Sequence, residues 1–295
     1  MRPRRYLMKI KSIVAWTLAV LAISVAFATH EANAQKFDKM YCVNFATLAN
    51  YPLDALLFGT GRGEKVNVPF QLCLAKSGNT VVSLDSGFTN MEIGQKWGAK
   101  DYVDYKTAFA KVGIKPEDVQ YVTIGHMHWD HGGGLTAFPN AKFIVQTREL
   151  EFAAGSMTQN KQAKAGFEVA DILNLVKLNW EGRVILVDGD VKDVIPGLSV
   201  YLTPGHTAGT QTVCLDTTKG NVCYTSDAVY MYRNIDEDIP LGFGLNLYQM
   251  VESYKKIRAA VGKGTLIPGH EPLLYSEPEK HGLKKIDDRT IAVVE

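Results

Sequence analysis

Short apolar runs rich in β-branched residues recur along the chain, and turn residues bound most of them. This pattern predicts strands at residues 40–46, 69–75, 80–84, 119–124, 142–146, 184–187, 198–202, 211–215, 222–225 and 265–267. Apolar residues at helical spacing predict helices at residues 104–112, 147–154, 165–178 and 246–261. Strands that alternate with helices indicate an α/β protein, and we expect two sheets with the helices outside them.

Local signals refine these elements. Asp104 is the expected N-cap of the first helix, and Asn246 with Gln249 has the spacing of a capping box at the start of the last helix. Two apolar segments lack a clean period. Residues 51–59 are either a lid over a site or a packed connection, and residues 231–248 either line a pocket or form ordinary core, which we prefer.

Residues 1–34 have the composition of an export signal. Five basic residues precede an apolar run at residues 13–28, and a small-residue cleavage pattern ends at Ala34. The run is shorter than the about 20 apolar residues of a membrane span, so an uncleaved anchor ranks second. The arginine pair at residues 4–5 also fits a twin-arginine signal, and both export routes stay open. We predict a periplasmic or secreted protein whose domain covers residues 35–295.

Composition and charge narrow the function classes. The 295 residues are 46% hydrophobic and 21% charged, which fits one soluble globular domain. The predicted leader holds five basic residues and one acidic residue, so its removal takes the formal net charge from +1 to −3. No basic run remains, which argues against nucleic acid as a partner. We expect no stable membrane insertion after leader removal and leave a homodimer open.

The four cysteines are Cys42, Cys73, Cys214 and Cys223, and none lies in a C-x-x-C pattern. A zinc–thiolate site is therefore not expected. Export permits disulfides, and Cys214 and Cys223 flank a predicted hairpin turn at residues 218–220. We expect buried free thiols, because a free cysteine often serves as a small core residue. Disulfides within the pairs Cys42/Cys73 and Cys214/Cys223 stay open as the alternative.

The candidate chemistry is concentrated in residues 125–134, which read Gly-His-Met-His-Trp-Asp-His-Gly-Gly-Gly. Four potential metal ligands fall within six residues of this stretch: His126, His128, Asp130 and His131. Imidazole and carboxylate groups are nitrogen and oxygen donors that zinc prefers. The three glycines let the backbone turn tightly behind the ligands. This stretch therefore predicts a metal site at the end of a strand.

Three further candidates, His206, Asp227 and His270, also follow predicted strands on loops. A Pro-Gly turn precedes each of the two histidines. The chain has seven histidines, and His30 lies in the predicted leader, so five of the other six lie at strand ends. Structural histidines would not gather in this way, so we expect all seven side chains to meet at one edge of the sheets.

The order H-x-H-x-D-H, His206, Asp227, His270 resembles that of the metallo-β-lactamase superfamily over most of the chain after the leader. The resemblance implies an αββα sandwich with the site at one edge. Asp227-Ala-Val-Tyr230 is similar to the N-acyl homoserine lactonases, in which a tyrosine three residues after the bridging aspartate meets the substrate. Further similarities are found at Leu53-Asp54, Pro69, Gly87 and residues 268–272. The export leader is a departure, since many such lactonases are cytoplasmic, and it leaves the physiological substrate open.

The resemblance also implies a centre of two divalent metals, most simply zinc. The seven expected ligands form two sets that share one bridging carboxylate: His126, His128 and His206 for the first metal, Asp130, His131 and His270 for the second, and Asp227 for both.

The implied function is opening of a lactone ring, that of an N-acyl homoserine lactone or a related lactone, by attack of a metal-bridging hydroxide. Tyr230 would donate a hydrogen bond to the developing oxyanion, and Asp130 would carry a proton to the leaving alkoxide. Tyr230 could instead be an ordinary aromatic residue at the end of a core strand. The alternatives for the whole chain are an exported phosphotriesterase or aryl esterase of the same superfamily, and a non-catalytic metal-binding module. The complete ligand set and Tyr230 weigh against the module.

Overall fold

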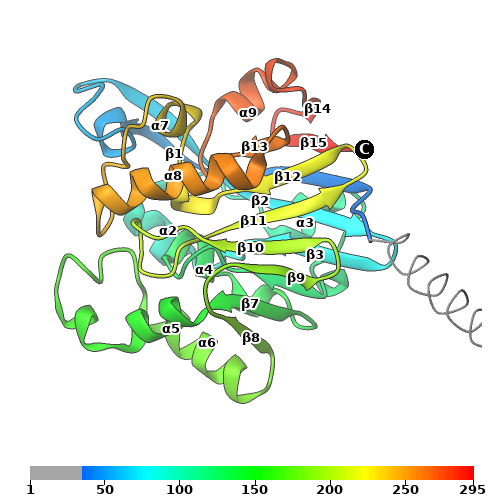
Figure 1. Cartoon of the computed structure of the whole chain (residues 1–295), viewed down its shortest axis with the longest axis horizontal. Helices are drawn as coiled ribbons and strands as arrows, with labels where there is room; N and C mark the ends of the chain where they lie inside the picture. Colours follow the sequence, from blue (N-terminus) through cyan, green and yellow to red (C-terminus); the bar gives the residue numbers. More distant parts are fainter. Residues whose placement is uncertain (1–34) are drawn as a thin grey trace, which may run out of the picture. The chain divides into compact units, whose positions relative to one another are not determined.

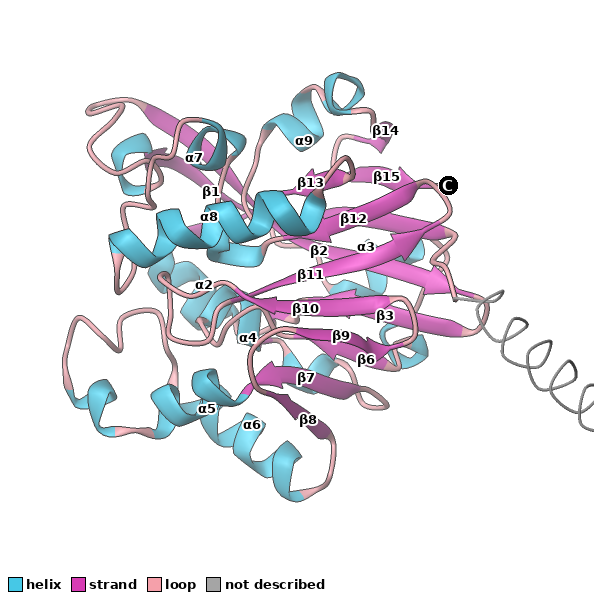
Figure 2. Ribbon diagram, in the orientation of Figure 1, coloured by secondary structure: helices cyan, strands magenta, loops and turns pink. Residues whose placement is uncertain are grey.

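The computed structural model describes residues 35–295, and the predicted export signal lies outside the described residues. Two β-sheets face each other and helices cover their outer sides (Figure 1, Figure 2). Within residues 35–295 the larger sheet has nine strands, in the order β14 (Lys284–Asp287), β15 (Thr290–Val294), β1 (Lys39–Pro52), β2 (Lys65–Ser77), β3 (Thr80–Leu84), β6 (Tyr121–Thr123), β7 (Lys142–Gln146) and β8 (Val184–Val187), with β5 (Ala99–Lys100) paired to β1. The smaller sheet has five strands in the same range, in the order β13 (Thr265–Ile267), β12 (Gly220–Tyr224), β11 (Gln211–Thr217), β10 (Leu198–Leu202) and β9 (Val191–Ile195).

The helices complete the outer layers. They are α2 (Met91–Trp97), α3 (Tyr105–Ala110), α4 (Trp129–Gly132), α5 (Thr147–Ala154), α6 (Val169–Trp180), α7 (Tyr232–Asp236), α8 (Leu247–Val261) and α9 (Leu273–Ser276). On the smaller sheet α8 packs against β11 and β12, and on the larger sheet α3 packs against β1 and α6 against β8. This arrangement confirms the expected αββα sandwich of the α/β class. None of the helices in the described range is long and apolar enough to cross a membrane.

Period-two alternation along the central strands separates the apolar layers. In β2, Leu72 and Leu74 belong to the layer between the larger sheet and its helices, whereas Cys73 and Ala75 belong to the layer between the sheets. Successive side chains of a strand point to opposite faces, so a strand buried on both sides is apolar throughout. This explains why the central strands read as continuous apolar runs.

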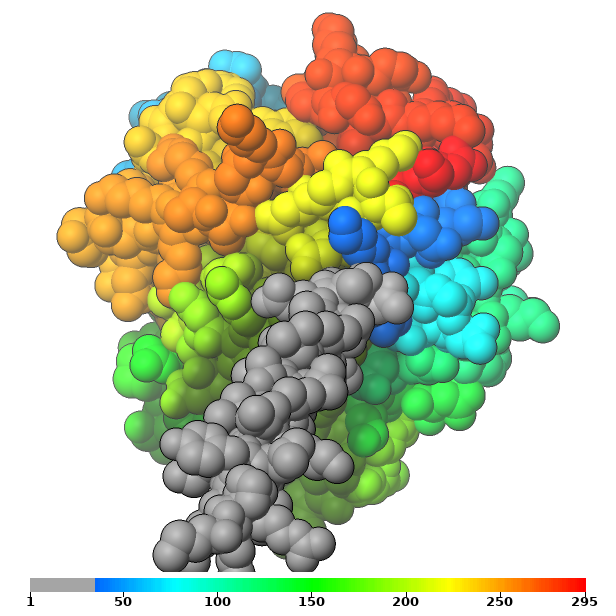
Figure 3. All heavy atoms as spheres, turned by 45° about the vertical axis from the view of Figure 1, so that its right-hand side comes forward, coloured from blue at the N-terminus to red at the C-terminus, as the bar shows by residue number. Residues whose placement is uncertain are grey.

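The segment before β1 joins the two sheets. Phe37 forms an isolated bridge with Thr217 at the end of β11, and the N–H group of Phe37 donates to the carbonyl of Asp216 at 2.8 Å. In Figure 3 the yellow hairpin of β11 and β12 accordingly lies between the orange helix α8 and the blue start of the described chain. The ring of Phe37 is fully buried in the layer between the sheets, so it closes that layer at this end.

Two predicted helix starts are confirmed, and one was wrong. The Asp104 side chain accepts from the N–H group of Thr107, and that of Asn246 accepts from the N–H group of Gln249. In contrast, α6 begins at Val169 rather than at residue 165. Gly166 has a φ of +88°, which a helix does not tolerate, and the following phenylalanine bridges to His128.

The expectation of free thiols was wrong, because both cysteine pairs form disulfides. Cys42 of β1 lies opposite Cys73 of β2, and Cys214 of β11 lies opposite Cys223 of β12. Residues directly opposite each other on antiparallel strands hold their Cβ atoms close enough for this bond. The sequence did not give the pairing, since a slip of one residue in register would turn either partner to the other face of the sheet.

Candidate metal centre

Every candidate ligand lies in the segment that directly follows a strand. His126 and His128 follow β6, His206 follows β10, Asp227 follows β12, and His270 follows β13. Helix α4 begins directly after His128 and carries the remaining two residues, Asp130 and His131, in its single turn. All of these side chains except Asp130 are buried. The structure therefore brings together the seven residues that the sequence pattern selects.

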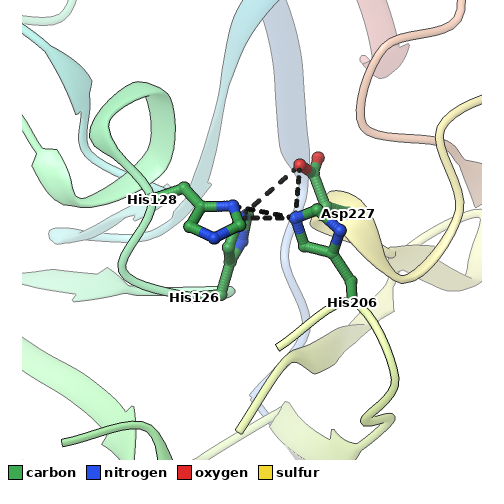
Figure 4. A group of neighbouring side chains, drawn as sticks. All are labelled: His126, His128, His206 and Asp227. Atoms are coloured by element: carbon green, nitrogen blue, oxygen red, sulfur yellow. Dashed lines mark hydrogen bonds and ion pairs between the residues drawn. The ribbon is translucent and has the colours of Figure 1, made fainter. Parts of the chain in front are cut away.

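The first cluster consists of His126, His128, His206 and Asp227 (Figure 4). The Nε2 atom of His206 lies 3.1 Å from Nε2 of His126 and 2.9 Å from Nδ1 of His128. It also lies 3.2 Å from Oδ2 of Asp227. Ligands at about 2.0–2.1 Å from a tetrahedral zinc ion are about 3.3 Å apart, so these separations fit one shared cation.

The second cluster consists of Asp130, His131, His270 and Asp227. The Nε2 atoms of His131 and His270 are 3.2 Å apart, and each lies 3.0 Å from Oδ1 of Asp227. Oδ2 of Asp130 lies 3.4 Å from Nε2 of His131 and 3.6 Å from Nε2 of His270. This spacing also fits one cation with two nitrogen and two oxygen ligands.

Asp227 belongs to both clusters. Its Oδ2 atom faces the first cluster and its Oδ1 atom faces the second. Among the described residues, no hydrogen-bond donor reaches Oδ1, although this atom is buried. A buried carboxylate oxygen without a donor is costly, and a cation on each side of the group would remove that cost. The residues present therefore fit a pair of divalent metal ions bridged by Asp227.

Three imidazole rings make a hydrogen bond through Nδ1, the nitrogen that points away from the centre. This bond fixes Nε2 as the nitrogen that faces the centre. The Nδ1 atom of His270 lies 2.9 Å from the carbonyl of Pro69, and that of His206 lies 3.0 Å from the carbonyl of Phe243. A carbonyl only accepts, so Nδ1 carries the proton and the lone pair of Nε2 points to the centre. The Nδ1 atom of His131 is held in the same way by a carboxylate. Such outer contacts are typical of imidazoles that bind metals.

That carboxylate belongs to Asp85, which the sequence pattern did not single out. It accepts from Nδ1 of His131 at 2.7 Å, the hydroxyl of Ser226 at 2.8 Å, the hydroxyl of Tyr224 at 2.9 Å and the N–H group of Gly125 at 2.6 Å. A Cβ atom at Gly125 would lie 2.2 Å from the Ser226 hydroxyl oxygen, so only glycine permits this close approach. Asp85 follows β3 directly, so the position at a strand end was the available signal.

The charges of the centre favour cations. Burial lowers the pKa of His126 and of His128 well below its usual value, so both rings are neutral donors of a lone pair. Burial acts in the same direction on His131, but the carboxylates of Asp227 and Asp130 outweigh it and raise the pKa of His131 well above its usual value. The same negative charge that holds a proton on this imidazole attracts a metal ion.

A pocket with a mainly apolar lining opens over the centre. Its lining includes eight large apolar or aromatic side chains: Leu48, Tyr51, Leu56, Phe70, Trp97, Trp129, Tyr230 and Phe243. Among the described residues that line it there is no lysine or arginine, and its two carboxylates, Asp130 and Asp227, belong to the centre itself. The pocket lining thus offers no lysine or arginine to an anionic substrate, and it suits a neutral molecule with an apolar part.

Tyr230 lies where the pocket meets the centre. Its ring centroid lies 5.3 Å from that of His270 and 5.6 Å from that of His206. Burial, and then the charges of Asp227 and Asp130, raise the pKa of Tyr230 well above its usual value, so the hydroxyl stays protonated. Tyr230 lines the pocket, so this hydroxyl is available as a hydrogen-bond donor there.

The two segments that the hydrophobic pattern left open each divide between core and pocket. In the first, Leu56 and Leu57 are both buried in the apolar cluster under α8, and Leu56 also lines the pocket. In the second, Leu241 is fully buried in the same cluster, whereas Phe243 lines the pocket. The preferred prediction of ordinary core for the second segment is therefore confirmed at Leu241 and wrong at Phe243.

Comparisons with known proteins agree with this geometry. The chain matches the metallo-β-lactamase superfamily over residues 74–270. It is 31% identical to AttM, an N-acyl homoserine lactonase of Rhizobium radiobacter, over 243 residues that cover 75% of this chain and 88% of that protein. It is 33% identical to an N-acyl homoserine lactonase of Bacillus cereus over 158 residues, or 53% of this chain. The match spans little more than half of that relative, at 57% of its length.

Solved structures share the fold. A quorum-quenching N-acyl homoserine lactone lactonase superposes with a TM-score of 0.66 at 24% identity, covering 81% of this chain and 94% of that one. AidC, a dizinc quorum-quenching lactonase, superposes with a TM-score of 0.63 at 16% identity, covering 89% of this chain and 98% of that one. Because the family match covers most of the sequence and AttM is matched over three quarters of it, the chain belongs to the metallo-β-lactamase superfamily, in which it resembles the N-acyl homoserine lactonases.

Proposed function

We propose that this chain is a metal-dependent hydrolase that opens the ring of an N-acyl homoserine lactone or a related lactone. The observation that carries the proposal is the pair of clusters that share Asp227 at the floor of an apolar pocket, with Tyr230 beside them. The names of the relatives support the reaction. The pocket lining supports a neutral substrate with an apolar part.

The donor set supports two divalent metals and favours zinc. Five imidazoles and two carboxylates are borderline and hard donors, which suit zinc better than magnesium or calcium. When bound, a pair of divalent cations supplies positive charge that acidifies water and polarises an ester carbonyl. The first cluster and the second cluster would each hold one ion, with Asp227 between them.

Two side chains act on the substrate itself. Asp130 lines the pocket and is more exposed than the other six residues of the centre. It takes a proton from the water that adds to the lactone carbonyl and passes this proton to the ring oxygen as the ring bond breaks. Tyr230 donates a hydrogen bond to the carbonyl oxygen as that atom gains negative charge. The new bond joins the water oxygen to the acyl carbon, and the product is a hydroxy acid.

A pH-indicator assay tests the proposal, since ester hydrolysis releases acid. Purified protein that carries two zinc ions per chain is given N-acyl homoserine lactones, aryl esters and phosphotriesters in parallel. We expect the highest kcat/KM with the lactones, loss of activity on chelation and recovery with zinc. The aromatic lining also accommodates an aryl group, so a preference for aryl esters or phosphotriesters would replace the lactonase with the second candidate. A fully loaded protein that turns over none of them would be a metal-binding module.

We also propose that residues 1–34 direct export to the periplasm or the exterior. The basic start, the apolar run and the cleavage pattern support this location. The two disulfides support it as well, because disulfides persist in oxidising compartments. N-terminal sequencing of protein from the periplasmic or secreted fraction is expected to begin at Gln35. Full-length protein confined to the cytoplasm, with reduced cysteines, would refute the location.

A further inference from the structure

Glu149 is a buried carboxylate that lies outside both clusters. It is the third residue of α5 and is 1% exposed. Its Oε1 atom accepts from the N–H group of Met127 at 2.8 Å. Its Oε2 atom accepts from the hydroxyl of Thr207 at 2.7 Å and from the N–H group of Gly209 at 2.9 Å. Both oxygens are therefore used, and the donors come from two separate loops.

These two loops carry all three histidines of the first cluster. Met127 stands between His126 and His128, and Thr207 directly follows His206. The first loop follows β6 of the larger sheet, and the second follows β10 of the smaller sheet. Glu149 therefore ties the two sheets together directly behind the first cluster.

The loop that carries Thr207 and Gly209 packs closely against α5. A Cβ atom at Gly209 would lie 2.4 Å from the backbone nitrogen of Glu149, so the loop rests on the first turn of α5. Thr207 is held a second time, because its N–H group donates to the hydroxyl of Thr210 at 2.9 Å. A side chain that fails to accept from both loops would leave buried donors without partners, and the loops would have to shift to satisfy them.

The histidine ligands of the second cluster make no hydrogen bond with Glu149, and His131 is held by a different carboxylate. Asp85 contacts His131 directly and also accepts from Ser226, the neighbour of Asp227. The bonds of Glu149 go to neighbours of the first-cluster histidines and to Gly209. Asp85 also accepts from the N–H group of Gly125, which precedes His126, so it contacts both halves of the centre. The bonds of Glu149 reach only the loops of the first cluster, so loss of Glu149 is expected to affect the first half.

We propose that Glu149 is a positioning residue for the first metal, because its carboxylate sets the separation of the three histidines. Its loss weakens metal binding at the first cluster and leaves the second cluster loaded. Loss of an outer partner of a metal ligand lowers affinity by about 10–100-fold, and we expect a change of this size at one site only. The proposal rests on the two-metal centre of the proposed function and is independent of the substrate.

Zinc binding to purified Glu149→Gln tests it, with metal content measured by mass spectrometry and affinity by competition with a chromophoric chelator. We expect two zinc ions in the wild type and one in the variant, with one dissociation constant raised about 10–100-fold and the other unchanged. The cobalt(II) form of the variant should lack the visible bands of one site. Glu151→Gln is the matched control, because this exposed glutamate lies on the same helix, and it should bind two ions.

A second pair of variants tests the same contact and keeps the proposal testable if Glu149→Gln does not fold. Thr207→Val removes one donor and keeps Glu149, whereas Thr207→Ser keeps the hydroxyl. The valine variant should weaken the same single site and the serine variant should not.

Two results would overturn the proposal. The first is Glu149→Gln that binds two zinc ions with wild-type affinities. The second is an equal loss at both sites together with a lower Tm of the metal-free protein, because that marks a general structural role. Wild-type protein that binds two ions and leaves lactones intact would refute the proposed function alone.

Discussion

The change of Tyr230 to phenylalanine tests whether its hydroxyl contributes to kcat without contributing to metal binding. Tyr230 is 7% exposed, and its ring packs against His206 and His270. Within residues 35–295 its hydroxyl donates to no protein acceptor. Phenylalanine therefore leaves no partner unsatisfied, and the free energy of unfolding should change by less than about 1 kcal/mol.

The expected loss of activity follows from the role of one hydrogen bond. Removal of a single donor to an oxyanion typically costs about 10²–10³-fold in kcat. Here metal ions would share the stabilisation of the same oxygen, so we expect a smaller loss in kcat of about 10–100-fold, or about 1.4–2.7 kcal/mol. KM should change little, because the bond strengthens only as charge develops on the carbonyl oxygen.

Steady-state kinetics with an N-acyl homoserine lactone, combined with zinc analysis, measure this effect. Tyr232→Phe is the control, because that hydroxyl donates to the carbonyl of Leu266 away from the centre. The control should lose some stability, about 1 kcal/mol, and keep its kcat. A wild-type kcat in Tyr230→Phe would remove this residue from the mechanism. Loss of zinc from the variant would instead assign the residue to the support of the centre.

Three further predictions concern the centre and the stability of the fold. Asp227→Ala should lose zinc and activity together, because both clusters share this carboxylate, and metal analysis beside kinetics checks it. Replacement of Cys42 and Cys73 by serine should lower the free energy of unfolding in urea by about 4 kcal/mol, from a disulfide that closes 31 residues. Burial, and to a smaller extent the charge of Glu168, raises the pKa of Asp171 from 3.8 to about 6. The folded state therefore binds this proton more tightly than the unfolded state does, and the free energy of unfolding falls as the pH rises from about 4 to about 6. Asp171→Asn should therefore raise the free energy of unfolding above pH 6 by about 1 kcal/mol, after allowance for partial exposure, and change it little near pH 4.

The candidate ligands were visible in the sequence because the information is local. His206 and His270 each follow a Pro-Gly turn after an apolar run, and Asp227 follows a similar run. A strand that ends in a turn places its next side chains at a sheet edge whatever the order of the strands. The convergence of these residues therefore needed only the prediction that the chain is a sandwich of sheets.

The features that escaped prediction depend on long-range pairing. Cys42 faces Cys73 only in the register that β1 and β2 adopt, which shifts between Asn44 and Ala46. The pairing of β15 with β1 joins opposite ends of the described chain, so no turn sequence between the two strands predicts it. Asp85 was missed for another reason: an aspartate after a strand is common in turns, and only its four donors distinguish it.

The division of the centre between the two sheets links metal binding to the alignment of the sandwich. Each cluster takes ligands from loops of both sheets: His126 and His206 meet in the first, and His131 and His270 meet in the second. The supporting carboxylates span the same division, because each of them starts from the larger sheet and accepts from a loop of the smaller sheet. A small slide of one sheet against the other would therefore separate the ligands of both clusters at once. Two buried carboxylates that resist this slide are the physical reason why loops from distant parts of the chain can hold ligand atoms about 3 Å apart.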